Sequence, residues 1–203
     1  KTLLRDIFGF SEFRPGQSEI IDAVVDKKNV LAIMPTGGGK SLCFQIPALM
    51  GEGLTVVISP LIALMRDQVR GLQAAGVAAE AITSANTEEE TDKIFSALNA
   101  SKLRILYLAP ERLASTAMQS ALHRYNVASL VVDEAHCVSQ WGHDFRPDYL
   151  RIGELRRSLG VPLAAFTATA DEETRQEIIE RLFDGIAPSS FLHGFDRPNI
   201  HFS

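Results

Sequence analysis

Three consecutive glycines, a lysine and a serine directly follow an apolar run near the start of this sequence. Residues 30–34 are apolar, and residues 36–41 read Thr-Gly-Gly-Gly-Lys-Ser. Glycines let backbone N–H groups approach an anion closely, and a helix that begins at such a turn favours negative charge at its N-terminus. In the pattern G-x-x-x-x-G-K-[ST], the lysine reaches the β- and γ-phosphates and the hydroxyl group holds Mg²⁺. These residues therefore predict a phosphate cradle in which Lys40 binds the terminal phosphates and Ser41 binds the metal ion.

The match to this pattern has one defect, because Met34 stands where the first glycine is expected. A flexible glycine turn beside a solvated lysine is the alternative interpretation. A buried strand, three glycines and a Lys-Ser pair in one place favour the cradle over that alternative.

Two adjacent carboxylates, Asp133 and Glu134, follow a second apolar run at 130–132. Such a pair is costly at a buried strand end unless a cation neutralises it. An NTPase holds Mg²⁺ at this kind of acid, so Asp133 is the expected metal-binding residue and Glu134 is expected to orient and deprotonate the attacking water. The alternative is a pair of acids favoured by a helix dipole. The nearby cradle makes the catalytic interpretation stronger, and only that context gives His136 a functional role.

An aromatic stretch comes immediately after these acids, at 137–149. It contains Trp141, the only tryptophan of the chain, together with Phe145, Arg146 and Tyr149. Aromatic rings beside an arginine suit stacking on unpaired bases and contact with a phosphate. A loop that packs its rings into the core is the alternative, and it is a serious one for Phe145 and Tyr149. Because the stretch follows the catalytic acids, we expect it to report nucleic-acid contact to the site of hydrolysis.

Upstream of the cradle, residues 8–17 read Phe-Gly-Phe-Ser-Glu-Phe-Arg-Pro-Gly-Gln. The Gln17 amide offers a donor and an acceptor, which suits the Hoogsteen edge of adenine. Phe10 and Arg14 are able to supply stacking planes. From physics alone, an exposed turn that acts as a hinge explains the same residues equally well.

Apolar runs rich in β-branched residues alternate with helical patterns along the chain, which predicts βα units and a parallel sheet. Most of the runs are continuously apolar, as expected for strands buried on both faces. The expected strands are 29–34, 55–59, 79–83, 103–108, 128–133 and 163–167.

Helical patterns stand between these runs. Thr87 opens a capping box, Pro110 opens another helix, and Asp171 is suited to cap a further one. The segment 11–26 reads as a helix or as a loop followed by a helix. One predicted helix is expected to end near Gly76 and to bury one face, formed by Leu61, Met65, Val69 and Leu72.

Ligands of such a sheet bind beyond the carboxyl ends of its strands. Five expected strand ends carry a polar motif, which is difficult to explain as maintenance of the fold. These motifs are 36–41, 59–60, 109–112, 133–136 and 167–169. We therefore expect them to lie on one edge of the sheet.

Length and composition limit the possible functions. A chain of 203 residues suits one sizeable domain, and it shows neither the roughly 20 apolar residues that span a bilayer nor a secretory signal pattern. Cys43 and Cys137 are far apart and lack metal-ligand spacing, which predicts reduced cytosolic thiols. The net charge of −5 argues against a non-specific nucleic-acid coat but allows a local patch. The start without methionine and the extended ending are typical of a fragment of a longer protein.

The order of the motifs resembles the N-terminal motor domain of the RecQ family of DNA helicases, in helicase superfamily two, and in particular its bacterial type. The motifs are FRPGQ, MPTGGGKS, SPLIALMRDQV, YLAPERL, DEAH, CVSQWGHDFRPDY, FTATA and FDRPNI. They extend from about Phe8 to Phe202. DEAH alone indicates only the superfamily, whereas its continuation and FRPGQ are far more specific. The methionine at the first glycine position is normal in this superfamily.

For the nucleotide, the resemblance implies ATP and Mg²⁺ as cofactors. Gln17 would recognise adenine, Ser41 and Asp133 would hold Mg²⁺, and His136 would couple hydrolysis to DNA. The implied ATP-binding residues are Phe10, Arg14, Gln17, Thr36, Gly37, Gly38, Gly39, Lys40 and Ser41. The implied catalytic residues are Lys40, Asp133, Glu134 and His136.

For DNA, the resemblance implies contact through several motifs. Ser59 and Arg112 belong to motifs that touch the DNA backbone, and Thr167 and Thr169 link hydrolysis to strand separation. The loop 139–146 resembles one that senses single-stranded DNA. The implied DNA-binding and coupling residues are Ser59, Arg112, Ser139, Gln140, Trp141, His143, Phe145, Arg146, Thr167 and Thr169.

The implied fold is an α/β, RecA-like P-loop NTPase domain with a central, mostly parallel sheet and helices on both faces. We expect one domain at 1–203, with an adenine-recognition segment at 1–28, a core at 29–185 and a connection to an absent second lobe at 186–203. The implied function is the first motor lobe of an ATP-dependent 3′-to-5′ DNA helicase of repair and recombination, with single-stranded and forked DNA as partners. A monomeric, cytoplasmic and nucleoid-associated fragment without a membrane partner is expected. Its hydrolysis should be feeble, because an arginine finger from a second lobe is worth roughly 10³–10⁵ in rate.

Three alternatives stay open at this point. The first is a P-loop enzyme of another class, such as a kinase or a metabolic ATPase. The second is a nucleic-acid-binding module with a relic nucleotide site, although intact Lys40, Asp133 and Glu134 argue against decay. The third is a relative that acts on RNA.

Overall fold

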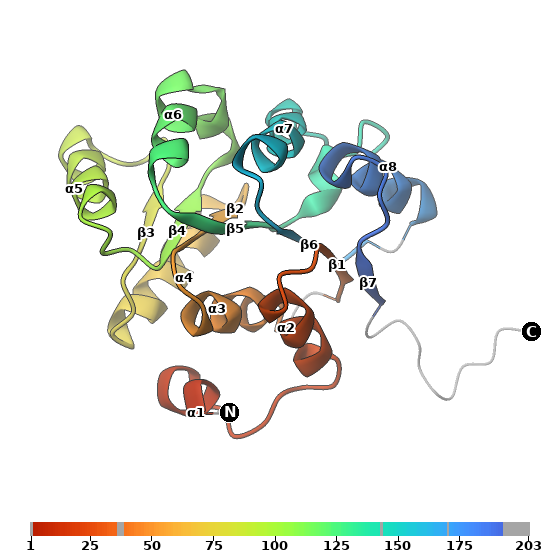
Figure 1. Ribbon diagram of the computed structural model, residues 1–203, viewed down its shortest axis with the longest axis horizontal. Coiled ribbons are helices and arrows are strands. Elements are labelled where there is room, and N and C mark those ends of the chain that lie inside the picture. Colours follow the sequence, from red (N-terminus) through yellow and green to blue (C-terminus); the bar gives the residue numbers. More distant parts are fainter. Residues whose placement is uncertain (1, 36–38, 143, 170, 193–203) are drawn as a thin grey trace, which may run out of the picture.

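The computed structural model describes residues 2–35, 39–142, 144–169 and 171–192. Its centre is a seven-stranded sheet in the order β3-β4-β2-β5-β6-β1-β7 (Figure 1), and all of its strand pairs are parallel. The predicted α/β class with a parallel sheet is confirmed. The strands are β1 (Val30–Ile33), β2 (Leu54–Ile58), β3 (Ala79–Ile82), β4 (Ile105–Leu108), β5 (Val127–Val132), β6 (Leu163–Thr167) and β7 (Ser189–Leu192).

Six of these strands lie where apolar runs predicted them. In β1, β2, β4 and β6 every residue is buried, because helices cover both faces of the sheet. The seventh strand, β7, was not predicted. It has exposed residues at alternate positions and forms an edge beside β1, where the Ser189 N–H donates to the Asn29 carbonyl at 2.9 Å.

The predicted helix caps are confirmed. The Thr87 hydroxyl accepts from the Glu90 N–H at 3.1 Å, and the Asp171 carboxylate accepts from the Glu173 N–H at 2.9 Å. The described α-helices are α1 (Thr2–Phe8), α2 (Gln17–Val25), α3 (Lys40–Met50), α4 (Ile62–Ala74), α5 (Glu88–Asn99), α6 (Thr116–Arg124), α7 (Leu150–Leu159) and α8 (Glu172–Phe183). Three short 3₁₀ helices are η1 (Pro110–Ala114), η2 (Ala135–Val138) and η3 (Pro147–Tyr149).

The helix predictions failed in four places. Leu61 is not part of the buried face of α4, since it is the extended N-cap residue and its side chain is 44% exposed. Because α4 begins at Ile62, after the Ser59-Pro60 turn, Leu61 lies before the helix and its side chain does not follow the helical spacing. Pro110 opens a 3₁₀ helix before α6 rather than one continuous helix, and neither α1 nor α7 was predicted.

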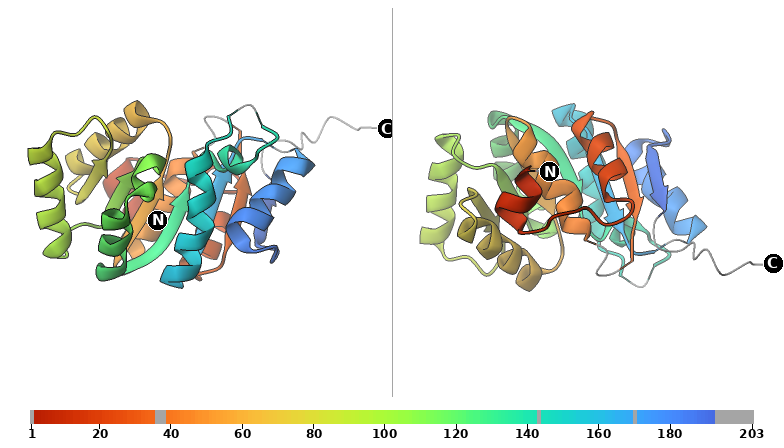
Figure 2. Two further views of the ribbon diagram at one scale, coloured as in Figure 1. Left: turned by 90° about the horizontal axis from the view of Figure 1, so that it is seen from above. Right: turned by 90° about the horizontal axis from the view of Figure 1, so that it is seen from below.

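Helices cover the two faces of the sheet in two groups. Helices α2 to α4 pack on one face, with α1 on the outer side of α2 and α3, and α5 to α8 pack on the other, as the views from below and from above show (Figure 2). Each face has its own apolar core, and the two cysteines are divided between them, Cys43 in the first and Cys137 in the second. No helix in the described part of the chain is long and apolar enough to cross a membrane.

All carboxyl ends of the strands lie at one edge of the sheet because every strand pair is parallel. The residues that follow β1, β2, β4, β5 and β6 are the polar motifs identified in the sequence. This edge is where ligands of open α/β sheets bind.

Candidate nucleotide-binding and catalytic site

Lys40, the first residue of α3, faces the two acids that follow β5. Its Nζ lies 3.8 Å from Oδ1 of Asp133 and 3.7 Å from Oε1 of Glu134. In the sheet, β6 separates β1 from β5, and the parallel topology carries both strand ends to the same edge. The structure therefore brings together the lysine of the cradle and the two predicted catalytic acids.

Asp133 is held in place by its surroundings. The residue is 6% exposed, and the Glu134 N–H donates to Oδ1 at 2.9 Å. The Tyr149 hydroxyl, itself buried, donates to the Asp133 backbone carbonyl at 2.9 Å. Burial raises the pKa of the Asp133 carboxyl above its ordinary value, whereas the Lys40 ammonium lowers it. Asp133 and Glu134 together place two carboxylates beside one lysine, and this excess of acid suits the binding of a cation.

Glu134 adopts a left-handed backbone conformation, with φ of 54° and ψ of 47°. Non-glycine residues rarely adopt this conformation, and such strain is concentrated at functional sites. The turn ends β5 and starts η2, and it keeps the Glu134 carboxylate near both Lys40 and His136. Oε2 of Glu134 lies 3.5 Å from Nδ1 of His136.

His136 connects the acids to β6 and to the segment that follows η2. Its Nδ1 is hydrogen-bonded to the Thr167 hydroxyl at 2.8 Å, and its Nε2 lies 3.5 Å from Oδ2 of Asp144. The Thr167 hydroxyl also accepts from the Thr169 N–H at 3.2 Å. Of the residues predicted to couple hydrolysis to DNA, His136, Thr167 and Thr169 are therefore in one hydrogen-bonded group.

Gln17 holds the end of the phosphate cradle. Its side chain is buried, its Nε2 donates to the Gly39 carbonyl at 3.1 Å, and its Oε1 accepts from the Arg14 N–H at 2.7 Å. Gly39 has a φ of 77°, and a Cβ atom there would lie closer than 3.0 Å to the Gln17 amide. Both ends of this amide are engaged by backbone groups, so its predicted role toward adenine stays a prediction. Phe10 is half-exposed.

The predicted phosphate-binding residues Thr36, Gly37 and Gly38 lie outside the described residues. Ser41 is the second residue of α3, directly after Lys40. Within the described ranges, no group of three or more His, Cys, Asp or Glu side chains could hold a metal ion by itself. This fits Mg²⁺, which proteins usually bind through one or two carboxylates together with substrate phosphates. Asp133 and the Ser41 hydroxyl are chemically suited donors.

Residues 139–146, called the aromatic loop below, differ strongly in exposure. Ser139 is fully buried, Phe145 is partly buried, and Gln140 and Arg146 are exposed. Trp141 is 83% exposed, which is unusual for so large an apolar side chain. The alternative of a ring packed into the core is thus wrong for Trp141 but correct for Tyr149, which is fully buried. His143 lies outside the described residues.

Ser59 and Arg112 follow β2 and β4 at the same edge of the sheet. The Ser59 hydroxyl is buried and accepts from the Leu61 N–H at 3.4 Å, and Arg112 Nη2 donates to the Thr83 carbonyl at 2.7 Å. Neither makes a hydrogen bond or ion pair with Lys40, Asp133 or Glu134 among the described residues. Their predicted contacts with the DNA backbone stay predictions.

Sequence reasoning missed two acids at this site, Asp144 and Glu177. Asp144 carried no distinguishing signal within the aromatic loop. Glu177 did carry one, because it stands on the apolar face of α8 between Thr174 and Ile178, where an acid is unexpected. The Glu177 carboxylate accepts from the Ser139 hydroxyl at 2.8 Å and from the Gln140 N–H at 3.0 Å.

Known proteins resemble this chain along most of its length. Residues 14–178 match the family described as DEAD/DEAH box helicase. The ATP-dependent DNA helicase RecQ of Pasteurella multocida is 46% identical over 202 residues, which are 99% of this chain and 32% of that protein. RecQ of Haemophilus influenzae is 43% identical over 203 residues, 100% of this chain and 33% of that protein. These relatives confirm the resemblance to RecQ helicases, and the chain spans about a third of their length.

Solved structures agree with the fold. The helicase domain of Pyrococcus furiosus Hef has a TM-score of 0.71 at 21% identity, covering 96% of this chain and 40% of that chain. The DUF1998 helicase MrfA bound to DNA has a TM-score of 0.68 at 17% identity, covering 95% of this chain and 27% of that chain. These similarities confirm the predicted RecA-like fold.

Proposed function

This chain belongs to the DEAD/DEAH box helicase family, and we propose that it is the ATP-binding motor lobe of a RecQ-type DNA helicase. The observation that carries the proposal is the position of Lys40 between two carboxylates at the carboxyl edge of the sheet, 3.8 Å and 3.7 Å away. One flexible ammonium group contacts both acids but offsets only one of their two charges, and it is the group that a phosphate chain at the N-terminus of α3 would engage.

Each residue of this cluster has a separate proposed role. Lys40 binds the terminal phosphates of ATP, and Ser41 and Asp133 hold the accompanying Mg²⁺, which neutralises phosphate charge when bound. Glu134 orients the attacking water and accepts its proton. The left-handed backbone at Glu134 sets the direction of its Cα–Cβ bond, and Lys40 and His136 contact its carboxylate.

His136 is proposed to couple this cluster to DNA. Its Nδ1 contacts Glu134 and Thr167, and its Nε2 contacts Asp144. Asp144 belongs to the aromatic loop, so a change in that loop reaches the catalytic acids through a single side chain. We propose that Trp141 and Arg146 of this loop contact single-stranded DNA.

The wider function rests on the relatives, of which this chain spans about a third. We propose that residues 1–28 recognise adenine, that 29–185 form the core to which the edge strand β7 adds, and that 186–203, which include β7, lead toward a second lobe that supplies an arginine finger. The whole protein would then move 3′-to-5′ on single-stranded and forked DNA in repair and recombination. A bacterial cytoplasm, at the nucleoid, is the proposed location. This lobe alone should hydrolyse ATP feebly, because the finger is worth roughly 10³–10⁵ in rate.

Replacement of the cradle lysine tests the nucleotide site. We expect Lys40→Ala to weaken binding of a fluorescent ATP analogue with Mg²⁺ by about 10- to 100-fold, because hydrogen bonds to charged groups contribute about 1.5–3 kcal/mol. Equilibrium titration followed by fluorescence anisotropy gives the affinity.

The control for this test is Lys102→Ala, which removes an exposed lysine before β4 and should leave the affinity unchanged. Wild-type affinity in Lys40→Ala would contradict the cradle assignment. A titration with oligo(dT) and oligo(U) in parallel distinguishes a DNA motor from a relative that acts on RNA.

A further inference from the structure

We propose that Glu177 is a positioning residue that fixes the base of the aromatic loop to α8 and thereby sets how Trp141 meets single-stranded DNA. The inference rests on the proposed DNA-binding role of that loop. Glu177 does not contact Lys40, Asp133, Glu134 or His136 through a hydrogen bond or ion pair among the described residues. It therefore acts through the loop and not on the reacting atoms.

Both carboxylate oxygens of Glu177 bind the start of the aromatic loop. Oε2 accepts from the Ser139 hydroxyl at 2.8 Å, and Oε1 accepts from the Gln140 N–H at 3.0 Å. The Ser139 oxygen in turn accepts from the Trp141 N–H at 3.3 Å. One side chain of α8 thus fixes three successive residues of the loop.

The burial of Glu177 indicates that these contacts persist. The residue is only 8% exposed, and a buried carboxylate is costly unless donors satisfy it. Hydrogen bonds to an ionised acceptor are about twice as strong as those between neutral groups. Because Ser139 is fully buried as well, the start of the loop is a fixed point, whereas Trp141 is 83% exposed two residues later.

The side of Trp141 that is turned toward α8 faces acidic residues. An open groove of about 710 Å³ lies between Trp141 and α8, and its lining includes Glu172, Glu173 and Glu180. Arg181 also lines this groove, but the carboxylates outnumber it and repel a phosphate backbone, so we expect nucleic acid to approach the indole ring from the side turned away from α8. The anchor at Glu177 keeps the ring in that orientation.

The same helix is connected to the catalytic group. α8 begins shortly after Thr167 and Thr169, and Thr167 binds His136. Glu177 therefore binds the start of the loop, and its end is held by the contact of His136 with Asp144 and by the Arg146 N–H, which donates to the Cys137 carbonyl at 2.9 Å. Between them, Trp141 is the largest exposed side chain.

The single tryptophan of the chain makes this anchor measurable. We expect Glu177→Ala to lower the fluorescence anisotropy of Trp141 without DNA, because the base of the loop is released. In a titration with short oligo(dT) followed by Trp141 emission, the same variant should bind about 10-fold more weakly, as expected for the loss of a charge-assisted anchor. Glu177→Gln keeps one acceptor oxygen in a side chain of the same shape. Its anisotropy and its affinity for oligo(dT) should therefore lie between those of the wild-type chain and those of Glu177→Ala.

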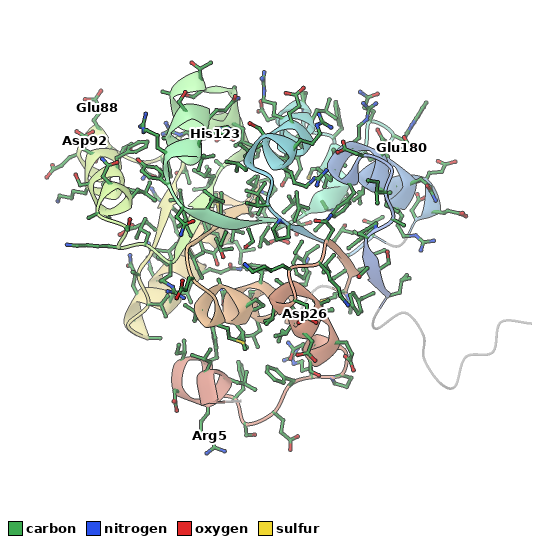
Figure 3. All side chains as sticks on the ribbon, in the orientation of Figure 1. Arg5, Asp26, Glu88, Asp92, His123 and Glu180 are labelled. Carbon is green, nitrogen blue, oxygen red and sulfur yellow. The ribbon has the colours of Figure 1, made fainter. Side chains whose placement is uncertain are left out.

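The matched control is Glu180→Ala, which removes an exposed carboxylate from the outer side of the same helix (Figure 3) and from the same groove. It should leave the anisotropy unchanged and should not weaken binding of oligo(dT). A purely electrostatic effect of a lost negative charge would instead appear equally in both alanine variants.

Two results would overturn the inference: wild-type anisotropy and affinity in Glu177→Ala, or equal changes in Glu180→Ala. Should Glu177→Ala fail to fold by circular dichroism, Ser139→Ala removes one of the two hydrogen bonds, and unchanged anisotropy in that variant would overturn it as well. If Trp141 emission of the wild-type chain does not respond to oligo(dT), the proposed DNA contact of the loop fails, whereas the anisotropy comparison still decides whether Glu177 is the anchor.

Discussion

Gly39 connects the predicted phosphate cradle to the N-terminal segment. Its φ of 77° is left-handed, and its carbonyl accepts from the Gln17 amide at 3.1 Å. Any side chain there would displace that amide, and with it the Arg14 backbone contact on the other end of Gln17. The end of the cradle and residues 14–17 therefore form one unit.

Gly39→Ala should both destabilise the chain and weaken ATP binding. A left-handed non-glycine residue costs roughly 1–2 kcal/mol, and the clash of the new Cβ with Gln17 adds to this cost. Urea unfolding measures the stability, and anisotropy of a fluorescent ATP analogue measures the affinity.

Gly76→Ala is the control, because Gly76 has a φ of 85° but a Cβ there would meet nothing within 4 Å. Gly76→Ala should lower the free energy of unfolding only by the cost of the left-handed backbone, and it should keep the affinity for ATP. Equal loss of affinity in both variants would show that the Gln17–Gly39 contact is irrelevant to the cradle.

At the scale of elements, α7 and α8 pack unusually closely at Gly153. A Cβ at Gly153 would lie closer than 3.0 Å to the Arg181 carbonyl of α8. Asp184 at the end of α8 accepts hydrogen bonds from Arg156 and Arg157 of α7, which hold the two helices together. Since α8 also carries Glu177, this packing supports the aromatic loop.

We predict that Gly153→Ala destabilises the chain by about 1–3 kcal/mol, the usual cost of overpacking. Its backbone partner cannot rotate away as a flexible side chain would. The free energy of unfolding in urea is the measurement.

The comparison variant for this prediction is Gly71→Ala in α4, where a Cβ would meet nothing within 4 Å. This change should stabilise the chain by about 0.5–1 kcal/mol, since alanine is the better helix former. The prediction is wrong if both variants shift stability in the same direction.

At the scale of the whole molecule, the single sheet has a separate apolar core on each of its two faces. Cys43 lies in the core beneath α2, α3 and α4, and Cys137 lies in the core beneath α5 to α8. Burial raises the pKa of the Cys43 thiol from 9.0 to about 12 and that of Cys137 from 9.0 to about 11. Each thiol therefore reports on one face of the sheet.

We predict that neither thiol reacts with Ellman's reagent at pH 8 while the chain is folded, because the thiolate is the nucleophile and the folded chain disfavours it. Both should become reactive at the same urea concentration, since the two cores share one sheet and should unfold together. Cys43→Ala and Cys137→Ala variants assign each reaction. Exposure of one thiol well before the other would show that the faces unfold separately.

The same shifts predict how stability depends on pH. The folded chain favours the neutral thiols, so their contribution to stability is complete below the unfolded pKa near 9.0. It is lost as the pH rises from about 9 through the folded values, about 11 and about 12. Urea unfolding at pH 8 and pH 10 should show the decrease, and it should be smaller in the double alanine variant.

The sequence alone determined the features that depend on neighbouring residues. Apolar runs predicted six strands, because a strand buried on both faces is apolar at most of its positions. Thr87 and Asp171 predicted helix starts, because a cap is a contact between residues two or three apart. The sequence also predicted that the polar motifs after the strands lie together, since parallel strands place their carboxyl ends on one edge of the sheet.

Only the tertiary structure decided which side chains meet. The strand order places β1 two strands from β5, and this brings Lys40 to Asp133 and Glu134. The edge strand β7 depends on pairing with β1 rather than on its own weak apolar pattern. The same holds for the aromatic loop, where Trp141 is exposed and Tyr149 is buried although the residue types predict neither. Glu177 reaches Ser139 because α8 packs beside η2, and contacts between distant segments follow from the packing of whole elements, which no local pattern encodes.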